Sequence, residues 1–518
     1  MLAPSKTGMA SPRALKLVSA VVILMLVSGT LYHREWATRQ AKKLRKGPVG
    51  FPSGTHDMVW KTETNKALDK VHSAYREDAH VLTDADDFLP HFRAVTEMPA
   101  KTLNETKLGC HWEDVSKVNF QYSTNEEWVL ENRPEEELES RRKEWHSFVA
   151  NNMVSWEKHK HNFSGRGVAI LGGNEKSLNR VKVTLGQMHL LKSELPVEIH
   201  YWGDELNDTS KTSLMMIYRN LYFNDLSGAH NTLATNHDNT FYVNYQLKPA
   251  AVVNSRFEEV LFLDSDNIPV VDPALLFESE TYKTYGSVFW PDIARTRPEN
   301  PMWGITNTEC RMDEYEMESG QILVDKRKYF YHLQLAAWFN NVHGEYYNNF
   351  LLGDKDLFRF AWHALKTTYG RPSRWITSVG TLVPSDPHNK DSEPFFCGHS
   401  FGQHHPDRGG PIAFFHGGLM KQIADEVIKW HVASQGGIFQ AYKRAPDDED
   451  KLATTQVFIK WDPGEYLPDE WRPDPPAELK INYCTDFKDV QVRNLEELVP
   501  GFNPVFKKLG GYWHAGVY

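Results

Sequence analysis

Cysteine and basic charge are both scarce in this sequence, and each shortage excludes a class of protein. The chain has 518 residues but only 4 cysteines, Cys110, Cys310, Cys397 and Cys484. None of them forms a Cys-x-x-Cys pair of the kind that binds zinc. The formal net charge is −10, whereas binding to nucleic acid requires a basic face opposite the phosphates. We therefore expect neither a zinc module nor a nucleic-acid partner.

Long uncharged hydrophobic runs are also scarce, and the clearest one lies near the N-terminus. Residues 17–32 read LVSAVVILMLVSGTLY and have basic residues on both sides. Such a segment fits either a cleaved signal peptide or an uncleaved anchor. It is shorter than the roughly 20 residues that span a typical bilayer, which suits the thinner membranes of the early secretory pathway. We favour a transmembrane signal anchor, with residues 1–16 as a cytoplasmic tail.

Beyond this run the composition changes from polar to strongly patterned. Residues 33–105 are charged and interrupted by Gly-Pro and Pro-Ser pairs, which is typical of a stem. We predict a catalytic domain over 106–445, entered through a helix at 134–149, and a C-terminal extension at 446–518 packed on it. Glycosylation sequons support a luminal location for all of this, and they begin at Asn104, Asn162 and Asn207.

The pattern of the central region predicts an α/β sheet. An apolar strand at 167–173 is followed by apolar residues at helical spacing over 178–188 and by a second strand at 196–202, which makes a βαβ unit. Strands alternating with helices indicate a nucleotide-binding sheet. Further strands are expected at 259–264, 286–290 and 321–325, and a further helix around 330–338.

An aspartate pair follows the most apolar of these strands. Asp264 and Asp266 stand two residues apart at its carboxyl end, where open α/β sheets bind their ligands. Residues i and i+2 of an extended chain face the same side, so both carboxylates can reach one hard divalent cation. The alternative is an ordinary turn, since Asp, Ser, Asn and Pro are all common turn residues.

A resemblance to a known family supports the first reading. The sequence resembles the fungal Golgi α-mannosyltransferases of the Mnn type, glycosyltransferase family 71, which implies a GT-A fold, a Rossmann-like mixed sheet flanked by helices. The matching motifs follow one another in order between residues 165 and 420. They are ILGG (170–173), LFLDSDNIPV (261–270), VFWPD (288–292), ESGQ (318–321), LGDKDLF (352–358), FCGH (396–399) and FFHGG (414–418).

The resemblance implies a third metal ligand and the residues that hold a nucleotide diphosphate. His416 would join Asp264 and Asp266 around Mn²⁺ or Mg²⁺, although most of the 23 histidines must be structural. Lys248, placed 16 residues before Asp264, and Lys421 would reach the diphosphate. Each lysine could equally be a solvated surface residue.

Further residues are candidates for the nucleotide and the sugar. Gly172 and Gly173 would let the nucleotide lie against the backbone, or they simply form a flexible turn. At the sugar end, carboxylates could bind hydroxyls and face the positive charge that develops at the anomeric carbon. The catalytic candidates there are Glu318, Asp354 and Asp356, with Asp292 and Gln321 as binding residues. Asp354 and Asp356 could instead cap the following helix.

The resemblance implies a type II Golgi protein that transfers mannose from GDP-mannose to a mannose-containing glycan with retention of configuration, and it could join a Golgi enzyme complex. We favour an α-1,2 linkage, and α-1,3 transfer or another nucleotide sugar stays open. A glycoside hydrolase with paired carboxylates and a non-catalytic glycan-binding homologue are the rival classes. All three pairings of the four cysteines into disulfides also stay open.

Overall fold

The computed structural model describes residues 81–82, 84–110, 133–237, 243–311, 314–351, 353–384, 394–417, 423, 425–444, 457–460, 484–487 and 490–517. All of them belong to one compact unit, Lys61–Tyr518. The predicted tail, anchor and first part of the stem lie outside the described residues. Within the described ranges, no helix has both the length and the hydrophobicity needed to cross a membrane.

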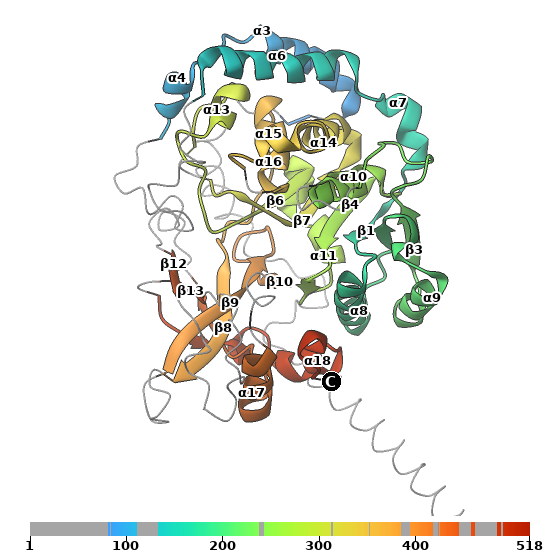
Figure 1. The fold of residues 1–518 in the computed structure, drawn as a ribbon, viewed down its shortest axis with the longest axis vertical. Helices are drawn as coiled ribbons and strands as arrows, with labels where there is room; N and C mark the ends of the chain where they lie inside the picture. Colours follow the sequence, from blue (N-terminus) through green and yellow to red (C-terminus); the bar gives the residue numbers. More distant parts are fainter. Residues whose placement is uncertain are drawn as a thin grey trace, which may run out of the picture. The chain divides into compact units, whose positions relative to one another are not determined.

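A mixed sheet of six strands forms the centre of this unit (Figure 1). Its order is β3-β2-β1-β4-β7-β6; β1 pairs in parallel with β2 and β4, and β2 with β3, whereas β7 is antiparallel to both β4 and β6. The mixed α/β class is as predicted, but the edge strand β3 was not foreseen. The strands are β1 Arg166–Leu171, β2 Val197–Tyr201, β3 Leu221–Asp225, β4 Glu259–Asp264, β6 Ser287–Pro291 and β7 Met317–Asp325.

Helices cover both faces of the sheet because its central strands are apolar on both sides. In β4, Val260 and Phe262 pack on one face and Leu261 and Leu263 on the other, all fully buried. The first face is covered by α10 Leu247–Asn254, α14 Lys326–Asn341 and α16 Lys355–Ala364, with α6 Glu135–Asn151, α7 Trp156–His159, α13 Pro301–Ile305 and α15 Gly344–Tyr347 beyond or beside them. The second is covered by α8 Glu175–Leu190, α9 Asp208–Ile217, α11 Ala274–Phe277 and α12 Glu280–Tyr285.

A second sheet, which the sequence did not predict, is built from the C-terminal part of the chain. Its order is β12-β13-β9-β8-β11-β14, and β10 joins it through β9 and also pairs with the short strand β5. Because β5 begins directly after the aspartate pair, this pairing ties the second sheet to the end of β4. The elements are β5 Asn267–Pro269, β8 Thr377–Pro384, β9 Pro394–His404, β10 Ile412–His416, α17 Asp425–Gln435, β11 Ala441–Arg444, β12 Val457–Lys460, β13 Cys484–Phe487, β14 Arg493–Asn494 and α18 Phe502–Lys508.

Packed structure begins earlier than the predicted catalytic domain. Helices α3 Phe88–Glu97 and α4 Leu103–Lys107 lie within the range assigned to the stem. In α3, apolar residues at helical spacing turn one face inward, and Phe92 packs 6.4 Å from Trp145 of α6, measured between ring centroids. Residue 106 is therefore too late as a boundary, because the polar residues of α3 conceal a short apolar stripe.

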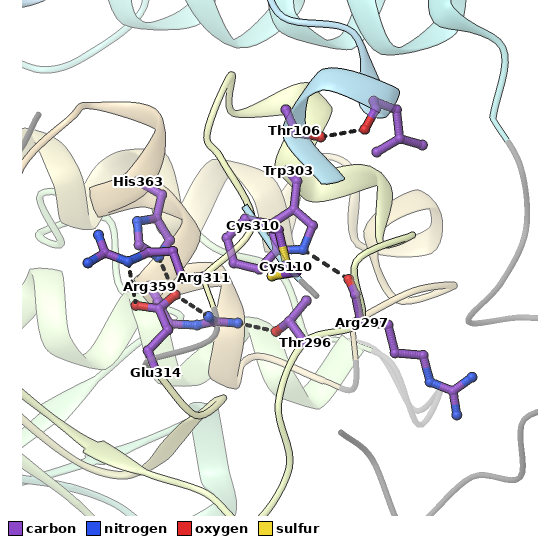
Figure 2. The surroundings of a disulfide bond; sticks show 11 residues. Thr106, Cys110, Thr296, Arg297, Trp303, Cys310, Arg311, Glu314, Arg359 and His363 are labelled. Atoms are coloured by element: carbon purple, nitrogen blue, oxygen red, sulfur yellow. Dashed lines mark hydrogen bonds and ion pairs between the residues drawn. A yellow bond between two sulfur atoms is a disulfide. The ribbon is translucent and has the colours of Figure 1, made fainter. Parts of the chain in front are cut away.

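A disulfide fastens this N-terminal region to the domain. Cys110 is bonded to Cys310, 200 residues later (Figure 2). The backbone amide of Cys310 also donates to the carbonyl of Thr106. Cys310 lies on the segment that leads into β7. This bond fixes one of the pairings left open by the sequence, and Cys397 is disulfide-bonded as well.

The two sides of α3 offer a matched test of this early boundary. Phe92 is 6% exposed and Leu89 is 59% exposed. We expect Phe92→Ala to lower the free energy of unfolding by about 3–5 kcal/mol, the cost of a large cavity, and Leu89→Ala to change it by less than about 0.5 kcal/mol. Chemical denaturation of the two variants measures this difference. Equally small losses of unfolding free energy in both would mean that α3 is part of the stem and not of the packed domain.

Candidate active site

The aspartate pair lies at the carboxyl end of β4, in the turn that leads to β5. Asp264 is the last residue of β4 and is partly exposed, whereas Asp266 is 6% exposed. The hydroxyl of Thr184, on α8, donates to the carbonyl of Asn267 (3.0 Å) and lies 3.3 Å from that of Ser265. The ordinary turn that was the alternative interpretation is thus present. The hydroxyl of Thr184 holds its backbone, so that the two carboxylates have defined positions.

His416 reaches the aspartates through strand pairing. It is the last residue of β10 and stands opposite Asn267 in the β5–β10 register. Its Nε2 lies 3.5 Å from Oδ1 of Asp266. Asp264, Asp266 and His416 each offer one ligand atom, and these atoms all lie within 4.8 Å of one another. The structure therefore brings together the three residues that were predicted as metal ligands.

This group fits a divalent cation. Ligands on opposite sides of Mg²⁺ stand about 4.2 Å apart, so movements of a few tenths of an ångström would close the set around one ion. Neither ring nitrogen of His416 makes a hydrogen bond within the described residues. Burial favours the neutral imidazole, but the carboxylates of Glu318 and Asp266 raise the pKa of His416 to about 10. These two carboxylates therefore favour a positive charge on or beside the imidazole. A bound metal ion would supply that charge in place of the second ring proton.

Lys248, at the start of α10, connects the aspartate pair with the GDKD motif. Its Nζ donates to Oδ2 of Asp264 (3.1 Å) and to Oγ of Ser319 (2.9 Å), and it lies 3.1 Å from Oδ2 of Asp354. Burial works against the ammonium, yet Asp264 and Asp354 hold the pKa of Lys248 above its usual value. The predicted diphosphate lysine is thus beside the site, paired with two carboxylates, and is not a solvated surface residue.

The three charged residues of the GDKD motif have different partners. Asp354 pairs with Lys248, while Lys355 contacts Oδ2 of Asp292 (2.5 Å) and Oε2 of Glu316 (2.9 Å). Asp356 accepts from the backbone amide of Met317, 3.0 Å away. The side chain of Asp354 makes no capping hydrogen bond to α16. Capping, the alternative for this motif, is therefore not what holds Asp354 in place.

The contacts of Asp356 do not fit the catalytic role that was predicted for it. Its carboxylate binds Arg359 at 2.8 Å, and Arg359 in turn binds Glu314 at 2.6 Å. Glu314 also faces His363 at 2.7 Å (Figure 2). Burial opposes the ionised form of Glu314, but His363 and Arg359 hold its pKa well below the usual value. Asp356 belongs to this buried charge network, which supports the start of β7.

Asp292 and the two glycines also differ from expectation. Both carboxylate oxygens of Asp292 already have partners, the amide of Ile293 at 2.7 Å and Lys355. A Cβ on Gly172 would come within 2.7 Å of Val181, and one on Gly173 within 2.7 Å of Tyr201. Close packing against neighbouring side chains thus explains why both residues are glycines. The structure leaves no need to invoke a nucleotide for them.

Two predicted binding residues remain. Gln321, on β7, is fully buried, and its Oε1 accepts a hydrogen bond from the side chain of Asn267. It therefore supports the turn below the aspartates and does not face solvent. Lys421 lies outside the described residues.

Lys355 and Glu316 lie beside the site but were not predicted from the sequence. A signal for them was present, because Glu314, Glu316 and Glu318 alternate along the chain into β7 and can share one face of an extended segment. Lys355 lies between two aspartates in the GDKD motif, which marks it as a potential ion-pair partner. Its Nζ lies at the acidic face formed by Asp292 and Glu316.

Comparisons with known proteins relate the chain to mannosyltransferases. Residues 165–309 and 303–405 match a family model described as "Mannosyltransferase putative". Alpha-1,2-mannosyltransferase MNN23 of Candida albicans is 27% identical over 322 residues, covering 52% of this chain and 51% of its own. Alpha-1,2-mannosyltransferase MNN2 of Saccharomyces cerevisiae is 29% identical over 147 residues, covering 28% and 24%. The chain thus spans about half the length of MNN23 and less of MNN2.

Solved glycosyltransferase structures show only a distant likeness. The bifunctional glycosyltransferase WbbM has 14% identity and a TM-score of 0.29, with 40% of this chain and 38% of that chain covered. The galactosyltransferase LgtC has 14% identity and a TM-score of 0.28, with 39% and 73% covered. Scores this low add nothing to the fold described above.

The matched family and the named relatives are mannosyltransferases, a class of glycosyltransferase. Residues 165–405 are thus similar to the family of the fungal Mnn proteins, as the motifs predicted. The aspartate pair lies inside the matched residues, and His416 lies just beyond them.

The buried charge network can be tested with a pair of arginines. Arg359 has a side chain that is 1% exposed, whereas Arg327 pairs with Asp325 at 2.8 Å and is 46% exposed. We expect Arg359→Met to cost about 3–5 kcal/mol, because it leaves buried carboxylates without a counter-charge. Arg327→Met should cost no more than about 1 kcal/mol. Denaturant titration measures both, and similar losses in the two variants would contradict the network's role.

Proposed function

We propose that this protein is a retaining α-mannosyltransferase that moves mannose from GDP-mannose to a mannose hydroxyl of a glycan, forming an α-1,2 linkage. One observation carries the proposal: two carboxylates and an imidazole converge at the carboxyl end of a central strand, inside and next to the segment that matches a mannosyltransferase family. The relatives named above supply the sugar and the linkage. The parallel order β3-β2-β1-β4, followed by antiparallel β7, supports a GT-A type of nucleotide-binding sheet.

In this proposal Asp264, Asp266 and His416 hold Mn²⁺ or Mg²⁺. The ion, when bound, neutralises the diphosphate of the donor and so makes it a better leaving group. Lys248 keeps positive charge at the same edge and holds Asp354 within 3.1 Å. Asp354 is then the carboxylate of the GDKD motif that faces the anomeric carbon, where it stabilises developing positive charge.

The cellular setting is part of the same proposal. Residues 17–32 anchor the chain in the Golgi membrane and the described domain lies in the lumen. The three sequon asparagines, Asn104, Asn162 and Asn207, are all exposed, as glycan attachment requires. Disulfide bonding of Cys110 with Cys310 agrees with an oxidising compartment.

A second linkage is the specific alternative. Relatives named as α-1,3-mannosyltransferases also match, among them MNT3 of Saccharomyces cerevisiae, 29% identical over 167 residues, covering 31% of this chain and 24% of its own. Linkage analysis of the product formed on α-mannobiose separates the two reactions. A product joined through O3 would replace the α-1,2 assignment and leave the rest of the proposal intact.

The donor is tested with a panel of nucleotide sugars, with and without Mn²⁺. We expect transfer from GDP-mannose alone, lost when the metal is chelated. Transfer that survives chelation would contradict the metal site, and transfer from a different nucleotide sugar would change the donor. Hydrolysis of the glycan without any donor would favour a glycoside hydrolase.

The ligands are tested by substitution. Asp266→Asn removes a negative charge at the proposed ion and should lower transfer at least about 100-fold, the lower end of the losses of about 100- to 1,000-fold seen when one electrostatic group is removed from an active site, with an unchanged melting temperature. Asp86→Asn, at an exposed position in the described N-terminal region, is the matched control and should keep full activity. Wild-type turnover by Asp266→Asn would exclude Asp266 as a ligand.

A further inference from the structure

Two residues of strand β7, Gly320 and Glu318, lie against His416. The first is Gly320, whose missing side chain leaves the room that the imidazole occupies. A Cβ built on Gly320 would lie 2.8 Å from Cε1 and 2.9 Å from Nε2 of His416. Gly320 is not among the residues with positive φ, so the backbone would accept alanine. The glycine is therefore required by the ring and not by the conformation of the strand.

The second residue of β7 that lies against His416 is Glu318. Its Oε1 accepts a hydrogen bond of 2.8 Å from the backbone amide of Gly320, which fixes the carboxylate against its own strand. Its Oε2 lies 3.5 Å from Nδ1 of His416, while Nε2 of the same ring lies 3.5 Å from Asp266. The imidazole is thus held between two carboxylates, with one nitrogen directed to Glu318 and the other to the aspartate pair.

We infer that Glu318 and Gly320 are positioning residues that orient His416 for the cation. The inference rests on the proposed function, because it needs a metal ion at the aspartate pair. The carboxylate of Glu318, 3.5 Å from Nδ1, is placed to accept Nδ1–H when the ring closes on an ion. A carboxylate in that position fixes the tautomer of a histidine, so that the lone pair of Nε2 is directed to the metal. Gly320 leaves the space in which the ring can take this orientation. This gives Glu318 a different task from the sugar-facing catalytic role that the sequence predicted.

The two roles of Glu318 predict different kinetics. A carboxylate that touches the sugar affects turnover at every metal concentration and leaves metal affinity unchanged. A carboxylate that orients a ligand affects metal affinity, typically by about 10- to 100-fold, and its loss is compensated by a high metal concentration. Titration calorimetry of Mn²⁺ binding to the full-length protein therefore distinguishes the two roles of Glu318 without any sugar donor.

The first variant is Gly320→Ala, which pushes the ring without removing a charge. We expect the Kd for Mn²⁺ to rise about 10- to 100-fold, with kcat returning to within about 3-fold of wild type at saturating Mn²⁺. Gly344→Ala is the matched control, because a Cβ there meets only ordinary contacts at 3.4 Å and 3.6 Å. It should bind Mn²⁺ like the wild type.

The second variant is Glu318→Gln, with the exposed Glu345→Gln as its control. We expect the same weakening of Mn²⁺ binding and the same recovery at high Mn²⁺. Wild-type Mn²⁺ affinity in both variants would overturn the inference, and a low kcat of Glu318→Gln at all Mn²⁺ concentrations would then make Glu318 catalytic while the proposed function stands. Failure of the wild type itself to bind Mn²⁺ would overturn the metal site and the inference together. If Glu318→Gln does not fold, Gly320→Ala decides alone.

Discussion

The antiparallel pairing of β5 with β10 is the interaction on which the site depends. Asp264 and Asp266 come from a strand of the first sheet, and His416 comes from a chain segment 150 residues later that belongs to the second sheet. Register alone decides which side chain of β10 stands beside the aspartates. A shift of one residue would turn the imidazole to the other face of the strand. This pairing therefore joins the two sheets at the point where the aspartates meet His416.

Near this pairing, buried carboxylates at the start of β7 each face a basic side chain. Along the entry to β7, Glu314, Glu316 and Glu318 face Arg359, Lys355 and His416 in turn. Each buried carboxylate has a cationic partner, which is what makes a cluster of this kind tolerable away from water. Glu314 and Glu316 pair with residues of α16, and Glu318 faces His416 of β10, so these contacts join the start of β7 to one helix and one strand. The acidic residues that look alike in the sequence thus have distinct tasks.

The sequence predicted the parts that depend on local pattern. The run before Asp264 is apolar on both faces and could only be a central strand, and the following carboxylates marked the functional edge. His416 was predicted as a ligand from the order of the family motifs. It could not come from periodicity, because its place is set by a pairing across 150 residues. The disulfide partner of Cys110 was equally hidden, since it depends on how α4 packs.

Other predicted site residues have contacts that the sequence could not reveal. Asp356 and Asp292 are charged residues in a family motif, and only the positions of Arg359 and Lys355 show that they are already paired. Gly172 and Gly173 follow a strand as nucleotide-binding glycines do, but neighbouring side chains explain them. In the second sheet, β9 has 11 residues but buries His399, Ser400 and Gln403, so it shows no period-2 alternation of apolar and polar residues that would reveal it.

The position of His416 has a consequence for how the chain is divided. The similarity that defines the family ends at residue 405, before β10 begins. A polypeptide cut at that limit would keep the aspartate pair and lose its third partner, together with the strand that supports β5. The end of the family-model match is therefore not the end of the candidate metal site, because His416, in the FFHGG motif, follows it.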